Sequence, residues 1–222
     1  MDAATLQAIY RRQTRWFAGE RNRLLRKIDI VSKGRVLDLG AGTGELLGEL
    51  DRRTNGFAVG LDADVAVLSL ASGRRVTGKG DAMPFRDGAF DLVVAQMFFM
   101  WAQPLGDTLA EVGRVLGPGG HLIAVAEPDY GGAIDHPSQC GYLAELAESL
   151  SCQGADVRIG RKLGGALRRA GFHVECGVHP VRPLEAARRD SVFATPELGA
   201  SPGDLEFVFM PYFHFLAVKP AG

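Results

Sequence analysis

Short apolar runs alternate with stretches of helical periodicity along most of this chain, an order that is typical of α/β proteins with a parallel sheet. Between the runs, apolar residues recur every three or four positions at 65–71, 105–116 and 157–170, which predicts helices. The pattern therefore predicts a doubly wound α/β sheet, to which a further β run at 207–218 belongs. The other runs, each of strand length, lie at residues 35–39, 57–61, 76–80, 92–95, 121–126 and 172–176.

Further segments lie before, within and after this pattern. Apolar residues recur near helical spacing in residues 1–30, which predicts a helix there. Residues 138–150 predict a helix inserted after the fifth strand, and residues 183–190 predict another. The prolines and glycines of 194–204 predict a loop.

Composition and charge narrow the class of protein. The 222 residues, 46% of them apolar and 23% charged, predict a single globular domain. A net charge of −1 argues against a nucleic-acid partner. Three cysteines without a CxxC pair, no run of membrane-spanning length and no secretory signal favour a cytoplasmic protein without a membrane span.

The stretch Val36–Leu47 carries the main chemical signal. It passes from an apolar strand through three alternating glycines into a helical pattern, so the backbone can approach a ligand closely. The nicotinamide-dinucleotide fingerprint requires a glycine where Glu45 stands, and an acid there would repel a pyrophosphate. No Gly-Lys-Ser/Thr follows, which excludes a P-loop. A cofactor without phosphate fits better, and the cationic S-adenosylmethionine (SAM) tolerates a nearby acid such as Asp38.

Val36–Gly44 resembles the first motif of class I SAM-dependent methyltransferases. It is closest to the small-molecule branch that includes the ubiquinone- and menaquinone-biosynthesis C-methyltransferases. Three later stretches resemble further motifs of that family in the same order, over about residues 35–175. These are Gly80–Phe85, Pro84–Val93 and the Leu-x-Pro-Gly-Gly turn at Leu116–Gly120.

The resemblance implies an architecture and a reaction. The fold would be a Rossmann-like, seven-stranded, mostly parallel sheet with an antiparallel last strand. Residues 1–30 would form a helical cap over the pocket, and residues 31–222 a SAM-binding core with a lid insertion at about 130–155. The implied reaction is transfer of the SAM methyl group to a small-molecule acceptor.

Acids at successive strand ends are the main cofactor candidates. Asp62 ends the second strand 18 residues after Gly44, close to the ~20 expected of an acid that binds ribose hydroxyls. Asp64 is the better helix cap, which leaves Asp62 for the ribose. The resemblance implies that Asp81 accepts from the adenine amino group and that the backbone N–H of Ala82 donates to the ring. A simple turn would explain the Gly-Asp pair as well. The full set of expected cofactor-binding residues is Asp38, Gly40, Ala41, Gly42, Gly44, Asp62, Ala63, Asp81, Ala82, Met83, Gln96, Met97, Tyr10 and Arg15.

The acceptor is expected beside the fourth and fifth strands. Phe98, Phe99 and Trp101 follow the fourth strand and could line the methyl group or the acceptor. In the family the loop after the fifth strand faces the acceptor, and an ordinary polar loop is the alternative. The residues expected there as acceptor ligands or a general base are Glu127, Asp129, Tyr130 and His136.

The basic segment Arg11–Lys27 allows three interpretations. It fits a solvated helix face, a cap in which Tyr10 or Arg15 contacts the ligand, or a segment that binds an anionic partner or is a cleaved organelle-targeting sequence. A non-catalytic SAM-binding protein and a methyltransferase acting on RNA or protein are the alternatives to a small-molecule enzyme. No metal site is expected, because the spacing of His136, Cys140 and Cys152 fits no zinc pattern. The acceptor, the atom methylated and the oligomeric state are not determined by the sequence.

Overall fold

A computed structural model describes residues 3–136, 141–179 and 206–221. The helix predicted at 183–190, the loop predicted at 194–204 and Cys140 lie outside the described residues.

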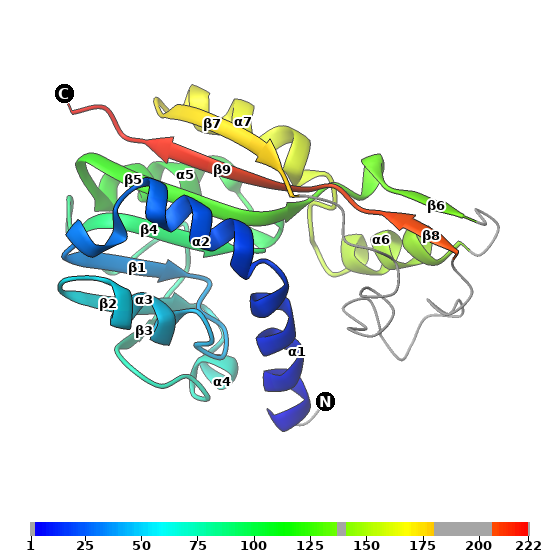
Figure 1. Cartoon of the computed structure of the whole chain (residues 1–222), viewed down its shortest axis with the longest axis horizontal. Helices are drawn as coiled ribbons and strands as arrows, with labels where there is room; N and C mark the ends of the chain where they lie inside the picture. Colours follow the sequence, from blue (N-terminus) through cyan, green and yellow to red (C-terminus); the bar gives the residue numbers. More distant parts are fainter. Residues whose placement is uncertain (1–2, 137–140, 180–205, 222) are drawn as a thin grey trace.

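The centre of the molecule is one seven-stranded sheet with the strand order β3–β2–β1–β4–β5–β9–β7 (Figure 1). Strand β9 runs antiparallel to both of its neighbours, and the remaining neighbours pair in parallel. The predicted fold class, with its antiparallel last strand, is therefore confirmed. The strands are β1 (Arg35–Leu39), β2 (Phe57–Asp62), β3 (Arg75–Thr77), β4 (Phe90–Gln96), β5 (Leu116–Pro128), β7 (His173–Val178) and β9 (Tyr212–Val218).

Helices cover both faces of this sheet. Alternate residues of β1 point to opposite faces: Val36 packs in one core with α2 and α3, while Leu37 and Leu39 pack in the other with α5 and α7. Both faces are thus buried, which explains why the strands read as continuous apolar runs. The helices are α1 (Ala3–Trp16), α2 (Ala18–Lys27), α3 (Leu47–Arg53), α4 (Val65–Leu68), α5 (Leu105–Val115), α6 (Tyr142–Cys152) and α7 (Ile159–Arg169), with 3-10 turns at Ile30–Ser32, Phe99–Trp101 and Tyr130–Gly132.

The chain order reverses between the adjacent strands β1 and β4. From β1 the chain proceeds outward through β2 to β3, and from β4 it proceeds the other way to β5. Ligands of open α/β sheets bind at such a switch point, beyond the carboxyl ends of the strands. The fold therefore places the glycine turn after β1 beside the aromatic segment after β4.

The N-terminal segment forms two helices rather than the single one predicted. The break falls at Phe17, whose side chain is 4% exposed. Its ring contacts His179 and Tyr212, with a centroid separation of 4.9 Å in each case. Burial of this ring bends the chain, so that α2 lies on the sheet while α1 extends toward the carboxyl edge (Figure 1).

Two other predicted elements were too long. The run at 207–218 divides into β8 (Phe207–Phe209) and β9, because Pro211 has no N–H with which to continue the ladder. Strand β8 instead pairs antiparallel with β6 (Ile134–His136) in a small second sheet. The helix predicted at 65–71 is a single turn, α4, and Asp64 caps it through Ala66 and Val67 as expected. None of the helices within the described ranges has the length and apolar character needed to cross a bilayer.

Candidate cofactor pocket

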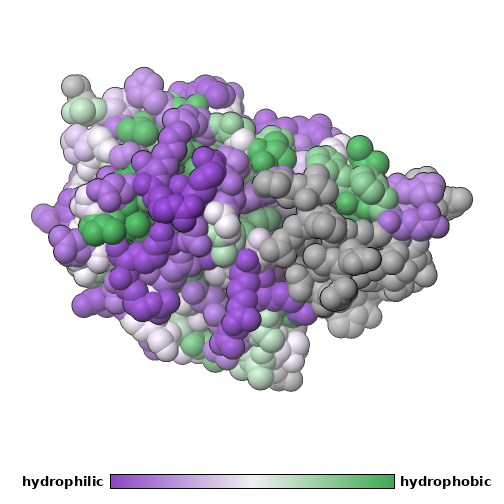
Figure 2. Space-filling view, in the orientation of Figure 1, coloured by the Kyte–Doolittle hydropathy of each residue, from purple (hydrophilic) through white to green (hydrophobic). Residues whose placement is uncertain are grey.

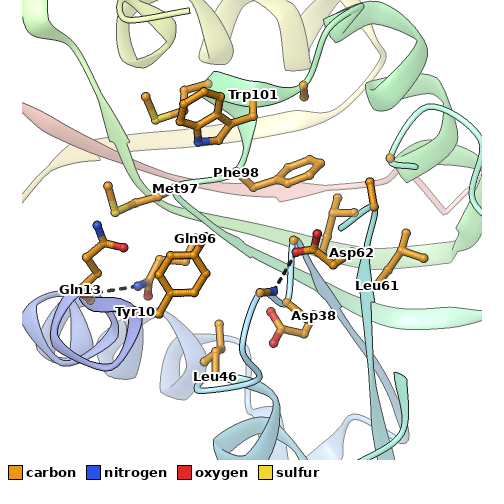
Figure 3. A pocket seen from close by; sticks show the side chains of 18 of the residues that line it. Tyr10, Gln13, Asp38, Leu46, Leu61, Asp62, Gln96, Met97, Phe98 and Trp101 are labelled. Carbon is orange, nitrogen blue, oxygen red and sulfur yellow. Dashed lines mark hydrogen bonds between the residues drawn. The ribbon is translucent and has the colours of Figure 1, made fainter. Parts of the chain in front are cut away.

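A cavity of about 660 Å³ opens at the carboxyl ends of β1, β2 and β4. In Figure 3, Tyr10 and Gln13 of α1 lie on one side of it, with Phe98 and Trp101 across the cavity. The predicted residues that line it are Tyr10, Asp38, Gly40, Ala41, Gly42, Asp62, Ala63, Asp81, Gln96, Met97 and Tyr130.

Two glycines after β1 let aromatic rings pack directly on the turn. Gly40 and Gly42 have φ values of +77° and +53°, a region that side chains rarely adopt. A Cβ at Gly40 would lie 2.5 Å from the Phe98 ring, and one at Gly42 would lie 2.8 Å from the Tyr10 ring. The turn, the segment after β4 and helix α1 thus form one cradle. Gly44 (φ +80°) instead makes room for Ala71 and does not line the cavity.

Asp38 presents a buried carboxyl group to this cavity. It is 2% exposed, and its Oδ2 atom has no hydrogen-bond partner among the described residues. Burial raises the pKa of Asp38 to about 7; Arg21 opposes this shift, and the charges of Asp62 and Glu49 add to it. A buried acceptor without a donor is costly, so a cationic or N–H-bearing ligand would stabilise it.

Arg21 is a feature that sequence reasoning missed. Its side chain is 2% exposed on α2, and the guanidinium donates to the backbone oxygen of Thr14, to Gln96 Oε1 at 2.8 Å and to Glu49 Oε2 at 2.7 Å. Arg21 therefore connects α1 and β4 beneath the pocket and contributes positive charge near Asp38. It is one of several arginines in the basic segment Arg11–Lys27, so nothing in the pattern singled it out.

Asp62 lines the cavity but is not free, contrary to expectation. Its Oδ2 accepts from the backbone N–H of Gly42 at 2.8 Å, and its Oδ1 accepts from that of Asp64 at 2.9 Å (Figure 3). Each carboxylate oxygen has a second lone pair that remains for a ligand hydroxyl. The carboxylate thus fixes the glycine turn while it faces the pocket.

The residues after Asp81 are placed differently from the prediction. Asp81 lines the cavity, but the N–H of Ala82 donates to Lys79 O at 3.3 Å and Ala82 does not line it. Met83 is 4% exposed in the core, and its N–H donates to Glu111 Oε2 at 2.7 Å. Arg15 is exposed on α1 and does not line the cavity either. The prediction for these three residues placed them at the ligand, and local pairing or burial keeps them away.

Gln96 and Met97 end β4 at the pocket. The Gln96 amide is held on both sides, by Arg21 and by a donated bond to Gln13 O at 3.5 Å. Met97 has a φ of +53°, an unusual conformation for a residue with a long side chain. Its N–H donates to Val125 O at 3.0 Å, which holds the strained residue in place.

Three of the four predicted acceptor residues do not line the cavity. Glu127 is fully buried, and its Oε1 accepts from the backbone N–H groups of Phe98 and Phe99, so it braces the segment after β4. Burial raises the pKa of Glu127 to about 8, although the backbone N–H groups that it accepts from stabilise its ionised form and lower the pKa. Asp129 is 3% exposed and pairs with Arg161 at 2.5 Å. These acids were expected at the acceptor because they follow the predicted fifth strand, but Glu127 pairs with backbone N–H groups and Asp129 with the half-exposed Arg161.

Of the other two predicted acceptor residues, His136 lies away from the cavity and Tyr130 lines it. His136 is exposed on β6 and lies 3.7 Å from Glu206, away from the cavity. Tyr130 lines the cavity, and burial raises the pKa of its hydroxyl, which therefore stays protonated. Tyr130 can donate a hydrogen bond there, but it is a poor base.

Residues far apart in the sequence complete the acceptor end. Phe98 and Trp101 line the cavity, whereas Phe99 is fully buried in the core. The lining residues that were not predicted include Gln13, Thr14, Leu146, Leu150 and Tyr212. Each looked like an ordinary helix or strand residue, and only the tertiary fold brings them to the pocket.

The pocket fits the group that the sequence motif implies. The Asp38 carboxyl, with one oxygen unpaired among the described residues, suits an ammonium group, and the acids Asp62 and Asp81 suit hydroxyl and amino donors. The aromatic rings of Phe98 and Trp101 suit an apolar or cationic centre. SAM carries all of these groups.

Comparison with known proteins agrees with this geometry. Residues 37–124 match the family model described as a methyltransferase domain. A malonyl-[acyl-carrier protein] O-methyltransferase from Coxiella burnetii is 39% identical over 105 residues, which cover 46% of this chain and 37% of that protein. A demethylmenaquinone methyltransferase from Thermus thermophilus is 37% identical over 105 residues, or 42% of this chain and 47% of that protein. The solved structure of a SAM-dependent methyltransferase from Methanosarcina mazei has a TM-score of 0.58 at 17% identity and covers 86% of this chain and 94% of its own.

The fold and the pocket define a Rossmann-like α/β domain with a ligand cavity at the switch point of the sheet. Residues 37–124 match the methyltransferase-domain family model, which agrees with the resemblance seen at Val36–Gly44. The chain spans less than half the length of the two curated relatives described above.

Proposed function

We propose that this protein is a SAM-dependent methyltransferase that methylates a small-molecule or carrier-bound acceptor. The observation that carries the proposal is the buried carboxyl of Asp38 beside the glycine turn, whose Oδ2 has no partner in the described part of the chain. A carboxyl in that state needs a cationic partner, and an amino-acid ammonium is one. The matched domain family supplies independent support.

The residues of the pocket divide into two groups. Asp38 would hold the ammonium group, Asp62 the ribose hydroxyls and Asp81 the adenine amino group. Gly40, Ala41, Gly42 and Ala63 would provide the surface of the turn, and Gln96, Met97 and Tyr10 its opposite wall. The acids would meet the polar parts of the cofactor, and the Met97 side chain and the Tyr10 ring would lie near its less polar parts.

The reaction requires little chemical activation from the protein. Bound SAM supplies an activated methyl group on a sulfonium. The chain's own residues would exclude water and align the acceptor, through the lining side chains Phe98, Met100 and Trp101 together with Leu146 and Leu150 of α6. Tyr130 would donate a hydrogen bond to an acceptor oxygen.

The names of the relatives bear on the acceptor. One relative is named for a malonyl group on acyl-carrier protein and the other for demethylmenaquinone. Both acceptors carry a nucleophilic oxygen or carbon atom close to a carbonyl group. The apolar side chains at the proposed acceptor end of this pocket suit such groups. We therefore propose a carbonyl-bearing acceptor.

The organisation and location of the chain belong to the same proposal. Tyr10 of α1 and Leu146 of α6 both line the pocket, which supports a single domain with residues 1–30 as a cap and residues 130–155 as a lid. Cys152 and Cys176 are free and exposed, which supports a reducing, cytoplasmic location.

The test is turnover with defined acceptors. Protein is incubated with methyl-labelled SAM and either malonyl-acyl-carrier protein or demethylmenaquinone, and S-adenosylhomocysteine and the labelled product are measured. Label in one acceptor, abolished by Asp38→Ala, supports the proposal. SAM binding without transfer to either acceptor would contradict this acceptor class, and absence of SAM binding would contradict the activity itself.

A further inference from the structure

A second cluster of polar side chains lies outside the cofactor pocket. Glu20 on α2, His214 on β9 and His179 directly after β7 bring a carboxylate and two imidazoles together. One oxygen or nitrogen atom from each lies within 4.8 Å of the others. None of the three lines the cofactor pocket. Figure 1 shows α2 crossing this part of the sheet, and Figure 2 shows hydrophilic residues gathered on the same face.

The cluster is fixed by the fold rather than by chance contact of surface side chains. His214 is 8% exposed, and its Nε2 lies 3.2 Å from Glu20 Oε1. The backbone N–H of His179 donates to Tyr212 O at 2.8 Å, which continues the pairing of β7 with β9. The His179 ring packs against Phe17 at 4.9 Å and against the His214 ring at 5.4 Å.

A glycine makes room for the buried imidazole. Gly177 is the register partner of His214, and a Cβ there would clash with His214 Nε2. Any side chain at this position would push the ring out of the cluster. Glycine in a strand often marks a place where another group approaches the backbone closely, as the imidazole does here.

Two imidazole nitrogens of this cluster have no hydrogen-bond partner among the described residues. They are His179 Nε2 and His214 Nδ1, and both are buried. His214 Nε2 is contacted both by an acceptor, Glu20, and by a donor, Arg23 Nη2 at 3.2 Å, and it can satisfy only one of them at a time. Such an arrangement is unfavourable for neutral histidines, and a group that accepts a lone pair from one nitrogen of each ring would relieve part of it.

Arg23 is the cation at this site. It pairs with Glu20, and its side chain is 50% exposed. Glu175, paired with Lys27, lies at the edge of the same surface and is largely exposed. A half-exposed guanidinium can rotate into solvent, and its position shows that the cluster favours positive charge.

We propose that Glu20, His179 and His214 form a site for a divalent late transition metal, with Zn²⁺ the best match. Two imidazoles and one carboxylate are a donor set that zinc uses commonly. Zinc–ligand bonds of about 2.0–2.1 Å place tetrahedral donors about 3.3 Å apart, so small side-chain rotations would close the cluster. The ion would displace Arg23 and join α2 to the edge formed by β7 and β9. The proposal does not depend on methyl transfer.

The test is calorimetric titration of the untagged, chelator-treated protein with Zn²⁺. We expect 1:1 binding, weakened at least about tenfold by Glu20→Gln and by His179→Ala. His173→Ala on β7 is the matched control, because His173 is exposed and lies outside the cluster, and it should leave the affinity unchanged. Arg23→Gln removes the competing cation and should tighten binding several-fold.

Several outcomes would overturn the proposal. These are no 1:1 binding, wild-type affinity in His179→Ala, or weaker binding in Arg23→Gln, which would show that the arginine stabilises the cluster as a plain ion-pair network. Circular dichroism establishes that each variant is folded. If His179→Ala does not fold, the Arg23→Gln titration and the visible absorption of bound Co²⁺ in the wild type still decide.

Discussion

Replacing Asp38 by Asn should remove a pH dependence from SAM binding. Asp38 has a pKa of about 7 because burial disfavours its charged form. A cationic ligand binds the ionised carboxylate, so binding should strengthen as the pH rises through this value. With that pKa, the ionised fraction increases about fifteenfold between pH 5.5 and pH 7. Amino groups of the ligand's type lose their proton only near pH 7.7–8.0, above this window.

The magnitude of the substitution follows from the same contact. Asn keeps the shape of the side chain but has no charge, and a hydrogen bond to a charged group contributes about 1.5–3 kcal/mol. Asp38→Asn should therefore weaken binding at pH 7 by about 10- to 150-fold and flatten its pH dependence. Arg21→Met should move the wild-type profile to higher pH, because Arg21 holds the Asp38 pKa down.

Isothermal titration calorimetry between pH 5.5 and pH 7 measures these effects. At pH 7 the wild type should release about half a proton on binding SAM, detected by comparing buffers of different ionisation enthalpy. A flat wild-type profile, or an Asp38→Asn variant with the same slope as the wild type, would refute the role assigned to Asp38.

Three further predictions concern stability and the glycine turn. The pKa of Glu127 is raised from 4.5 to about 8, so its ionisation lowers the free energy of unfolding as the pH rises through that range. In urea unfolding, Glu127→Gln should have the same free energy of unfolding as the wild type at pH 5. At pH 9 its free energy of unfolding should exceed that of the wild type by as much as about 5 kcal/mol. Equal stability at both pH values would contradict this. Asp62→Ala should weaken SAM binding by roughly 1–3 kcal/mol in a folded protein, and unchanged affinity would remove the ribose assignment. Gly42→Ala should lower the free energy of unfolding by about 1–2 kcal/mol because of the positive φ at this position. The new methyl group should also clash with the Tyr10 ring, and Tyr10→Ala should relieve that clash. A double-mutant cycle without coupling would show that the ring does not pack there.

Local sequence signals predicted the sheet because both of its faces are buried. Continuous apolar runs located β1, β2 and β4, and the glycines at 40 and 42 located the turn. Signals of the same kind placed Asp38 at the pocket. Asp38 lies near the carboxyl end of a central strand, and ligands of open α/β sheets bind beyond those ends at the switch point.

Three of the four residues predicted for the acceptor do not line the cavity, for a physical reason. Glu127 lies near the end of β5 and accepts from backbone N–H groups after β4, while Asp129, just beyond β5, pairs with the half-exposed Arg161. Whether an acid faces a pocket or braces a loop depends on tertiary contacts that no periodicity encodes. Arg21 escaped notice for the same reason, because its burial is a property of the packed helix rather than of its neighbours in sequence.

A crystal structure with S-adenosylhomocysteine tests the central claim most directly. We expect the product in the cavity at the carboxyl ends of β1, β2 and β4, with its amino group on Asp38, its ribose on Asp62 and its adenine beside Asp81. Density for the product elsewhere, or a cavity that takes up a phosphate-bearing nucleotide and not this product, would contradict the account.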